Sequence, residues 1–153
     1  MIELKNHWKR YEQLFGCVEE EGGPRHRDGG YKAAVYILTA DVQLSELALR
    51  AADWEGIDFA KIYRGLKGGC YSDTQLTMLR VAADLFNGGK VGGRTATPQE
   101  MASCLWGAAD VLCTALYLWK GRAAKEGWNG VVCAEETLQE KLARDIEAAQ
   151  LGD

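Results

Sequence analysis

The sequence predicts an all-α protein, folded as a single-domain orthogonal bundle of six or seven helices around a long central helix. The first observation behind this prediction is that apolar residues recur at helical spacing through most of the 153 residues. Paired glycines, such as Gly22-Gly23 and Gly88-Gly89, separate the periodic segments. Residues 98–120 form one long apolar stretch preceded by a helix-start signal. A chain of this length can bury a core, so residues 1–153 are expected to form one domain.

Three helices are predicted from periodicity in the first third of the chain. Residues 3–16 and 43–54 carry apolar side chains every three or four positions. Residues 31–40 contain the β-formers of VYILT, which leave a strand open as an alternative. The alanines before them extend the apolar period, so a helix is favoured there.

Two further helices are predicted from their capping residues. Asp58 is expected to cap a short helix that ends at Gly65, and Ser72 or Asp73 to cap a longer one. Asp and Ser side chains accept hydrogen bonds from the free N–H groups of a first helical turn. The longer helix is expected to end at Asn87, which two glycines follow.

The last predicted helix occupies residues 134–150. Its apolar residues make one narrow face, formed by Leu138, Leu142, Ile146 and Ala149. Glu140 and Arg144 are one turn apart, in the favourable order for an ion pair. The glycine-containing segment 121–134 is the predicted joint. There, residues 134–151 could separate from the bundle or pair with a second copy, so a homodimer is one expectation.

A capping box predicts where the central helix begins. Thr97 suits the cap, Pro98 the first helical position, and Glu100 the reciprocal bond to the cap. Asp110 is the single charged residue within 101–119, which raises the question of a membrane span. A span needs about 20 mainly apolar residues, and an Asp at its centre costs roughly 2.5–3.5 kcal/mol. The small residues of this segment supply too little hydrophobicity to offset that cost, so a core helix is favoured.

The central helix is expected to have a polar and an apolar side. The polar stripe consists of Ser103, Gly107, Asp110, Thr114, Tyr117 and Gly121. The apolar side is expected to face the core through Met101, Leu105, Ala108, Leu112, Leu116 and Trp119. The stripe, flanked by Trp106, is the main candidate for binding a ligand or partner, because its side chains can line a small pocket or groove. The alternative is a plain solvent-exposed edge of a buried helix.

A second candidate lies in the loop of residues 22–28. Arg25 and Arg27 stand there with His26 between glycines and could bind a phosphate or a carboxylate. Three glutamates precede the loop, at positions 19–21, which argues against a purely anion-binding patch. The alternative interpretation is a solvated surface loop.

Charge and cysteine content narrow the class of protein. The net charge is −4, and residues 97–153 hold five basic against nine acidic side chains. This balance disfavours direct nucleic-acid binding. The five cysteines form no C-x-x-C pair, and the chain opens without a secretory signal, so reduced thiols in a cytoplasm are expected.

Catalytic and metal chemistry find little support in the sequence. The two histidines, His7 and His26, stand in separate segments without metal-ligand spacing. Cys104 and Cys113 lie in apolar company, where a thiol usually packs as a small hydrophobe. The expectation is therefore no catalytic set, no metal and no cofactor, and a binding protein is favoured over an enzyme.

Four motifs resemble an uncharacterised family of small proteins from phages and prophages of Gram-positive bacteria. They are residues 7–11 (HWKRY), 31–39 (YKAAVYILT), 56–59 (GIDF) and 85–89 (LFNGG). With the central helix they cover residues 5–120, and 121–153 fall outside the match. The resemblance implies an accessory gene of a mobile element, with no catalytic residues to carry over. It also implies that Trp8, Tyr11, Tyr31 and Tyr36 belong to a shared core.

Three functions are compatible with these observations. The first is a phage or prophage accessory protein that binds a host protein in the cytoplasm and acts as an anti-defence or anti-CRISPR inhibitor of a bacterial defence system. The second is a small-molecule binder that sequesters a nucleotide signal through Arg25, Arg27 and Asp110. The third is a minor enzyme acting on nucleotides or nucleic acid. Aromatic anchors and a shaped groove suffice for the first function.

Overall fold

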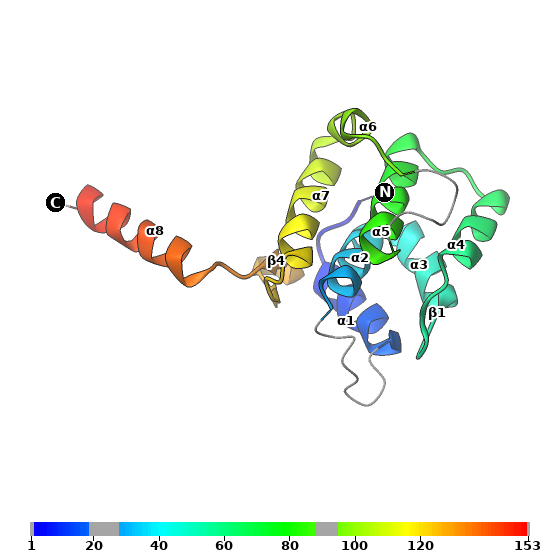
Figure 1. Ribbon diagram of the computed structural model, residues 1–153, viewed down its shortest axis with the longest axis horizontal. Coiled ribbons are helices and arrows are strands. Elements are labelled where there is room, and N and C mark those ends of the chain that lie inside the picture. The colour runs from blue at the N-terminus through cyan, green and yellow to red at the C-terminus, as the bar shows by residue number, and fades with distance from the viewer. Residues whose placement is uncertain (1, 19–27, 88–94, 153) are drawn as a thin grey trace.

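The computed structural model describes residues 2–18, 28–87 and 95–152 (Figure 1). Within them the fold is mostly helical, as predicted, with eight α-helices against the six or seven expected. The helices are α1 (His7–Val18), α2 (Gly29–Ala40), α3 (Val42–Ala51), α4 (Phe59–Gly65), α5 (Asp73–Asn87), α6 (Pro98–Ala102), α7 (Trp106–Trp119) and α8 (Leu138–Leu151). Two antiparallel strand pairs join them: β1 (Ala52–Asp53) with β2 (Gly56–Ile57), and β3 (Ala124–Glu126) with β4 (Val132–Ala134).

The centre of the bundle is α2, not the predicted helix over 98–120. Every side chain from Ala33 to Ala40 is buried, and α1, α3, α5 and α7 all pack against this helix. The helix over 31–40 is thus confirmed against the strand alternative. Asp28 caps it by accepting a hydrogen bond from the Gly30 N–H at 2.7 Å. Gly30 also permits close packing on α5, because a Cβ there would lie 2.8 Å from the Leu85 carbonyl oxygen.

The predicted continuous helix over 98–120 is wrong, because the chain breaks between α6 and α7. The capping box of Thr97 and Glu100 begins α6 as expected. The Gln99 carbonyl then accepts from both the backbone N–H of Ser103 at 2.9 Å and its hydroxyl at 2.8 Å, and such a side-chain bond to the preceding turn tends to bend a helix. Leu105 has an extended backbone (φ −57°, ψ 151°), and α7 begins after it.

Polar groups join the N-terminal helices to the core. Asp41 is fully buried, caps α3 through the Leu44 N–H at 3.0 Å, and accepts from Gln75 of α5 at both carboxylate oxygens. His7 is also fully buried, with Nε2 at 2.9 Å from the Thr39 hydroxyl. These bonds supply partners for polar groups that would be costly to bury alone.

Within the segment 121–134, which the sequence predicts as a joint, residues 124–134 form a β-hairpin. Strands β3 and β4 pair from Ala124–Ala134 to Glu126–Val132. Asn129 (φ 60°) and Gly130 (φ 73°) form its left-handed turn. Val132 is buried in the core, so the hairpin is part of the folded body.

Helix α8 starts at Leu138 rather than 134 and projects away from the body (Figure 1). All its side chains are exposed. A capping box of Thr137 and Glu140 begins it. The predicted Glu140–Arg144 pair is wrong: Glu140 pairs with Arg122 of the body, and Arg144 pairs with Glu136 at 3.0 Å.

The structure tests, for the residues that it describes, whether the apolar segment after Thr97 could span a membrane. No helix there combines the length and the apolar character needed to cross a bilayer. The break at residues 103–105 is one reason, because it leaves α7 with 14 residues where a span needs about 20.

Candidate functional site

The predicted polar stripe does not survive as one continuous feature. Ser103 lies outside α7 and bonds to the Gln99 carbonyl. Gly107 lies near Ile2, whose Cγ2 would be 4.0 Å from an added Cβ. Thr114 is half-buried and hydrogen-bonds the phenol of Tyr36. The helix break therefore divides the predicted stripe: Ser103 lines a groove between α5 and α6, whereas Gly107 and Thr114 stay on α7 with Asp110 and Tyr117.

Thr114 serves as a hydrogen-bond partner of the buried Tyr36 phenol. Burial raises the pKa of the Tyr36 phenol to about 12, and the hydrogen bond with Thr114 only partly opposes this. The nearby Cys133 and Asp110 raise this pKa further. The phenol therefore stays neutral at physiological pH and serves as a core hydrogen-bonding group beneath the β3–β4 hairpin.

The remaining candidates form an exposed strip along α7. Trp106, Asp110, Cys113 and Tyr117 are spaced i, i+4, i+7 and i+11, which places them on one side of the helix. The Trp106 side chain is 87% exposed and that of Tyr117 is 50% exposed. The Arg122 guanidinium lies 4.1 Å from the centre of the Tyr117 ring, within range of a cation–π interaction. We call these four residues and Arg122 the aromatic strip.

Beside the strip lies a groove that the sequence did not predict. Leu105 and Leu116, expected in the core, are 72% and 53% exposed, and Trp119 is half-exposed at the end of α7. The groove runs between α6 and α7 over α5 and has a volume of about 170 Å³. We call it the apolar groove; its lining is Val81, Met101, Ala102, Ala109, Leu112, Cys113 and Leu116. Because this lining carries no polar side chain other than a thiol, the groove suits aliphatic groups.

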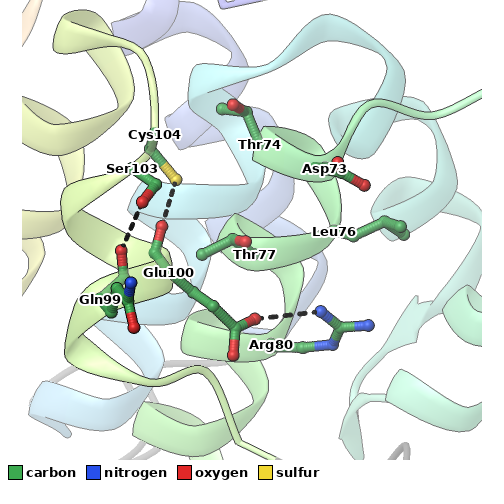
Figure 2. A pocket seen from close by; sticks show the side chains of 9 residues that line it. All are labelled: Asp73, Thr74, Leu76, Thr77, Arg80, Gln99, Glu100, Ser103 and Cys104. Atoms are coloured by element: carbon green, nitrogen blue, oxygen red, sulfur yellow. Dashed lines mark hydrogen bonds and ion pairs between the residues drawn. The ribbon is translucent and has the colours of Figure 1, made fainter.

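A second, polar groove of about 510 Å³ lies between α5 and α6 (Figure 2). The side chains of Arg80 and Glu100 point toward one another across it, 3.5 Å apart. Asp73 and Glu100 outnumber Arg80, so the groove is net negative and disfavours a phosphate. The hydroxyls of Thr74 and Thr77 are suited to a neutral or cationic polar molecule.

The candidate nucleophiles and bases are not activated. Burial raises the pKa of the Cys104 thiol above its usual value, and the thiol donates to the Glu100 carbonyl. Burial lowers the pKa of His7 to about 4, against a smaller opposing effect of its bond to the Tyr36 carbonyl. His7 is enclosed in the core and cannot reach a substrate. Among the described residues, no cluster of three His, Cys, Asp or Glu side chains could hold a metal ion.

The loop candidates Arg25 and Arg27 lie outside the described residues. The structure brings together Trp106, Asp110 and Tyr117, and it adds Arg122, Leu105 and Leu116. One signal in the sequence pointed to the exposed Leu105 and Leu116, but none pointed to Arg122. Residues 105–119 are apolar around most of the helix circumference, more than one buried face requires.

Comparison with known proteins assigns no relative to the chain. No protein-family model matches it, and neither the curated proteins nor the solved structures contain a significant match. The resemblance to a phage and prophage family therefore stays a prediction from the four sequence motifs.

Proposed function

We propose that this protein acts by binding a host protein in the bacterial cytoplasm, as a phage or prophage accessory protein that inhibits a defence system. The observation that carries the binding function is the aromatic strip, on which Trp106 is 87% exposed. The phage setting and the defence target come from the sequence resemblance alone.

The composition of the aromatic strip supports a protein partner. Trp, Tyr and Arg are the residues that most often dominate the binding energy of protein interfaces, and the strip contains one of each. Arg122 lies over the Tyr117 ring, so its guanidinium is already ordered before a partner arrives. An ordered anchor loses less side-chain entropy on binding, which favours affinity. Asp110 adds one charge that can select a basic group on the partner.

The test is a complex rebuilt from purified components. Tagged full-length protein is used to capture a partner from host lysate at moderate salt, the partner is identified, and its affinity is measured with purified material. Trp106→Ala is expected to weaken binding about 30-fold or more, the effect of losing a hot-spot residue worth about 2 kcal/mol. Trp128→Ala is the matched control, because Trp128 is also 87% exposed but lies at the hairpin tip. Equal affinities for parent and Trp106→Ala would refute the role of the strip.

The polar groove favours small-molecule binding as a second candidate function. Its volume of about 510 Å³ falls in the range of ligand sites. Its negative balance argues against the nucleotide predicted from Arg25 and Arg27. A thermal-shift screen with nucleotides and with cationic metabolites separates these cases, because a ligand that binds only the folded state raises the melting temperature. Saturable stabilisation by a nucleotide would favour the sequestering function over the protein-binding one.

A further inference from the structure

The C-terminal helix carries an apolar face on which none of the described residues packs. Leu138, Leu142 and Ile146 are 83%, 59% and 51% exposed, and with Ala149 they follow one side of α8. Leu151 is 82% exposed and lies about half a turn around the helix from this side, at 100° per residue. We call the four residues from Leu138 to Ala149 the α8 stripe. An amphipathic helix of this kind gains its stability by covering its apolar face.

The start of α8 is fixed relative to the body. Glu140 bonds back to Thr137 in the capping box and also pairs with Arg122, which follows α7. Arg144 pairs with Glu136 at 3.0 Å, across the end of the short connection from β4. These contacts direct the helix away from the body, as Figure 1 shows. Folding α8 back onto its own α7 would break the Arg122–Glu140 pair and reverse the chain within residues 135–137.

The apolar groove and the α8 stripe match one another in chemistry. Helix α8 has 14 residues and is about 21 Å long at 1.5 Å per residue, whereas the α7 side of the groove runs from Ala109 to Leu116, about 10 Å, and so accommodates part of the stripe. The groove offers an aliphatic lining and the stripe offers aliphatic side chains. We propose that α8 of one copy packs its stripe into the apolar groove of a second copy, in a reciprocal exchange that forms a twofold dimer.

The area of the contact favours exchange over a single one-way contact. One helix about 21 Å long and 10 Å wide covers a strip on the order of 200 Å². A stable complex buries about 800 Å² on each partner. In a reciprocal exchange each copy contributes both its groove and its stripe, which doubles the buried strip to about 400 Å² per copy, and further contact between the two bodies has to supply the rest. The same surface patch then serves both subunits, as twofold symmetry requires.

The exchange leaves room for the proposed function. Trp106, Asp110 and Tyr117 lie beside the groove on the same helix, and the arm is not expected to cover them. Self-association and host-protein binding thus share only Cys113, which borders both surfaces, and otherwise use different residues of α7. Variants of the α8 stripe test the first, and Trp106→Ala tests the second, so the two proposals can fail separately.

Analytical ultracentrifugation of the full chain over a range of concentrations tests the dimer. Leu142→Glu is expected to raise the dimer dissociation constant more than tenfold, and Leu116→Glu in the groove is expected to do the same. Leu151→Glu is the matched control: it places the same charge on the far side of α8 and should leave the constant unchanged. Circular dichroism checks that each variant is folded. A parent protein that is monomeric at every concentration, or a dimer that persists in Leu142→Glu, overturns the proposal.

Cross-linking determines which surfaces meet. Ile146→Cys, combined with Cys70→Ser to remove an exposed thiol, supplies a thiol on the stripe, and Cys113 supplies one in the groove. A short bifunctional maleimide is expected to join the two positions into a species of twice the chain mass, and adding Cys113→Ser is expected to abolish that link. A 113–146 link within one chain would show that α8 folds back on its own body. A link between two 146 positions would show α8 pairing with α8. Either result overturns the exchange.

Discussion

Helices α2 and α7 are both rich in apolar side chains, yet they are buried to different degrees. Four helices surround α2, and every side chain from Ala33 to Ala40 is buried. In α7 the buried side chains are Ala108, Val111, Leu112, Ala115 and Leu118, all on one side. Its other side exposes Leu116, Trp106 and Tyr117. An apolar helix that is covered on one side only is typical of an interaction surface, because water leaves that surface favourably when a partner covers it.

The largest expected difference in the free energy of unfolding is between a truncated side chain in α2 and one in α7. Leu38 is fully buried, so Leu38→Ala is expected to lower the free energy of unfolding by about 2–5 kcal/mol through lost burial and a cavity. Trp106→Ala removes a larger but exposed side chain and is expected to change stability by less than about 0.5 kcal/mol. Urea denaturation of both variants checks this. A loss at Trp106 comparable to that at Leu38 would mean that the aromatic strip is already buried in solution.

Acid is expected to weaken the packing between α1 and α2 through His7. The unfolded state binds a proton with the ordinary pKa of 6.5, whereas burial lowers the pKa of folded His7 to about 4. Protonation therefore favours unfolding below pH 6.5, and the penalty is complete below about pH 4. From pH 7 to pH 5 the loss is about 2 kcal/mol.

Urea denaturation at pH 7 and at pH 5 measures the free energy of unfolding of the parent and of His7→Gln. The variant is expected to start less stable at pH 7, because its amide cannot reproduce the imidazole's packing. It should lose about 2 kcal/mol less than the parent on acidification. Parallel pH profiles for the two proteins would contradict the role given to His7.

A smaller effect is expected at the C-terminal end of α2, where Asp41 is buried. Gln75 donates to both carboxylate oxygens of Asp41 at 3.1 Å. Gln75→Ala is expected to cost about 1.5 kcal/mol, because a buried charged acceptor loses a donor while its bond to Leu44 remains. Gln43→Ala is the control, since Gln43 is exposed and accepts from the same amide. If both variants lost equal stability, the carboxylate would not be the important acceptor.

Much of the fold followed from local patterns in the sequence. Asp58, Ser72 and Thr97 all cap helices where their side chains predicted it. The break after Ala102 did not follow, because Ser103 and Cys104 are compatible with a helix interior. Both side chains donate to carbonyls of the preceding turn, at Gln99 and Glu100, which is a bonding pattern that a continuous helix also allows.

The candidate site was harder to predict than the fold. Periodicity identifies a face of a helix but not which face the core covers when both are apolar, and α7 is such a case. Trp106 and Tyr117 were found because aromatic residues near a polar one suggested a binding surface. Arg122 was missed because it lies after the end of α7 and reaches back over Tyr117. The apolar groove was missed because it depends on the break between α6 and α7 and on packing against Val81 of α5.

The smallest effect on global stability is expected in α8, the helix most unlike α2. Its capping box contributes locally, so Thr137→Ala is expected to cost about 1 kcal/mol of helix stability. Because the α8 side chains are exposed among the described residues, the free energy of unfolding of the body should change by less than about 0.5 kcal/mol under conditions where the protein is monomeric. Amide hydrogen exchange reports the two separately: protection should fall in residues 141–148 and stay unchanged in α2. If α2 also lost protection, α8 would be packed against the body of its own chain in solution.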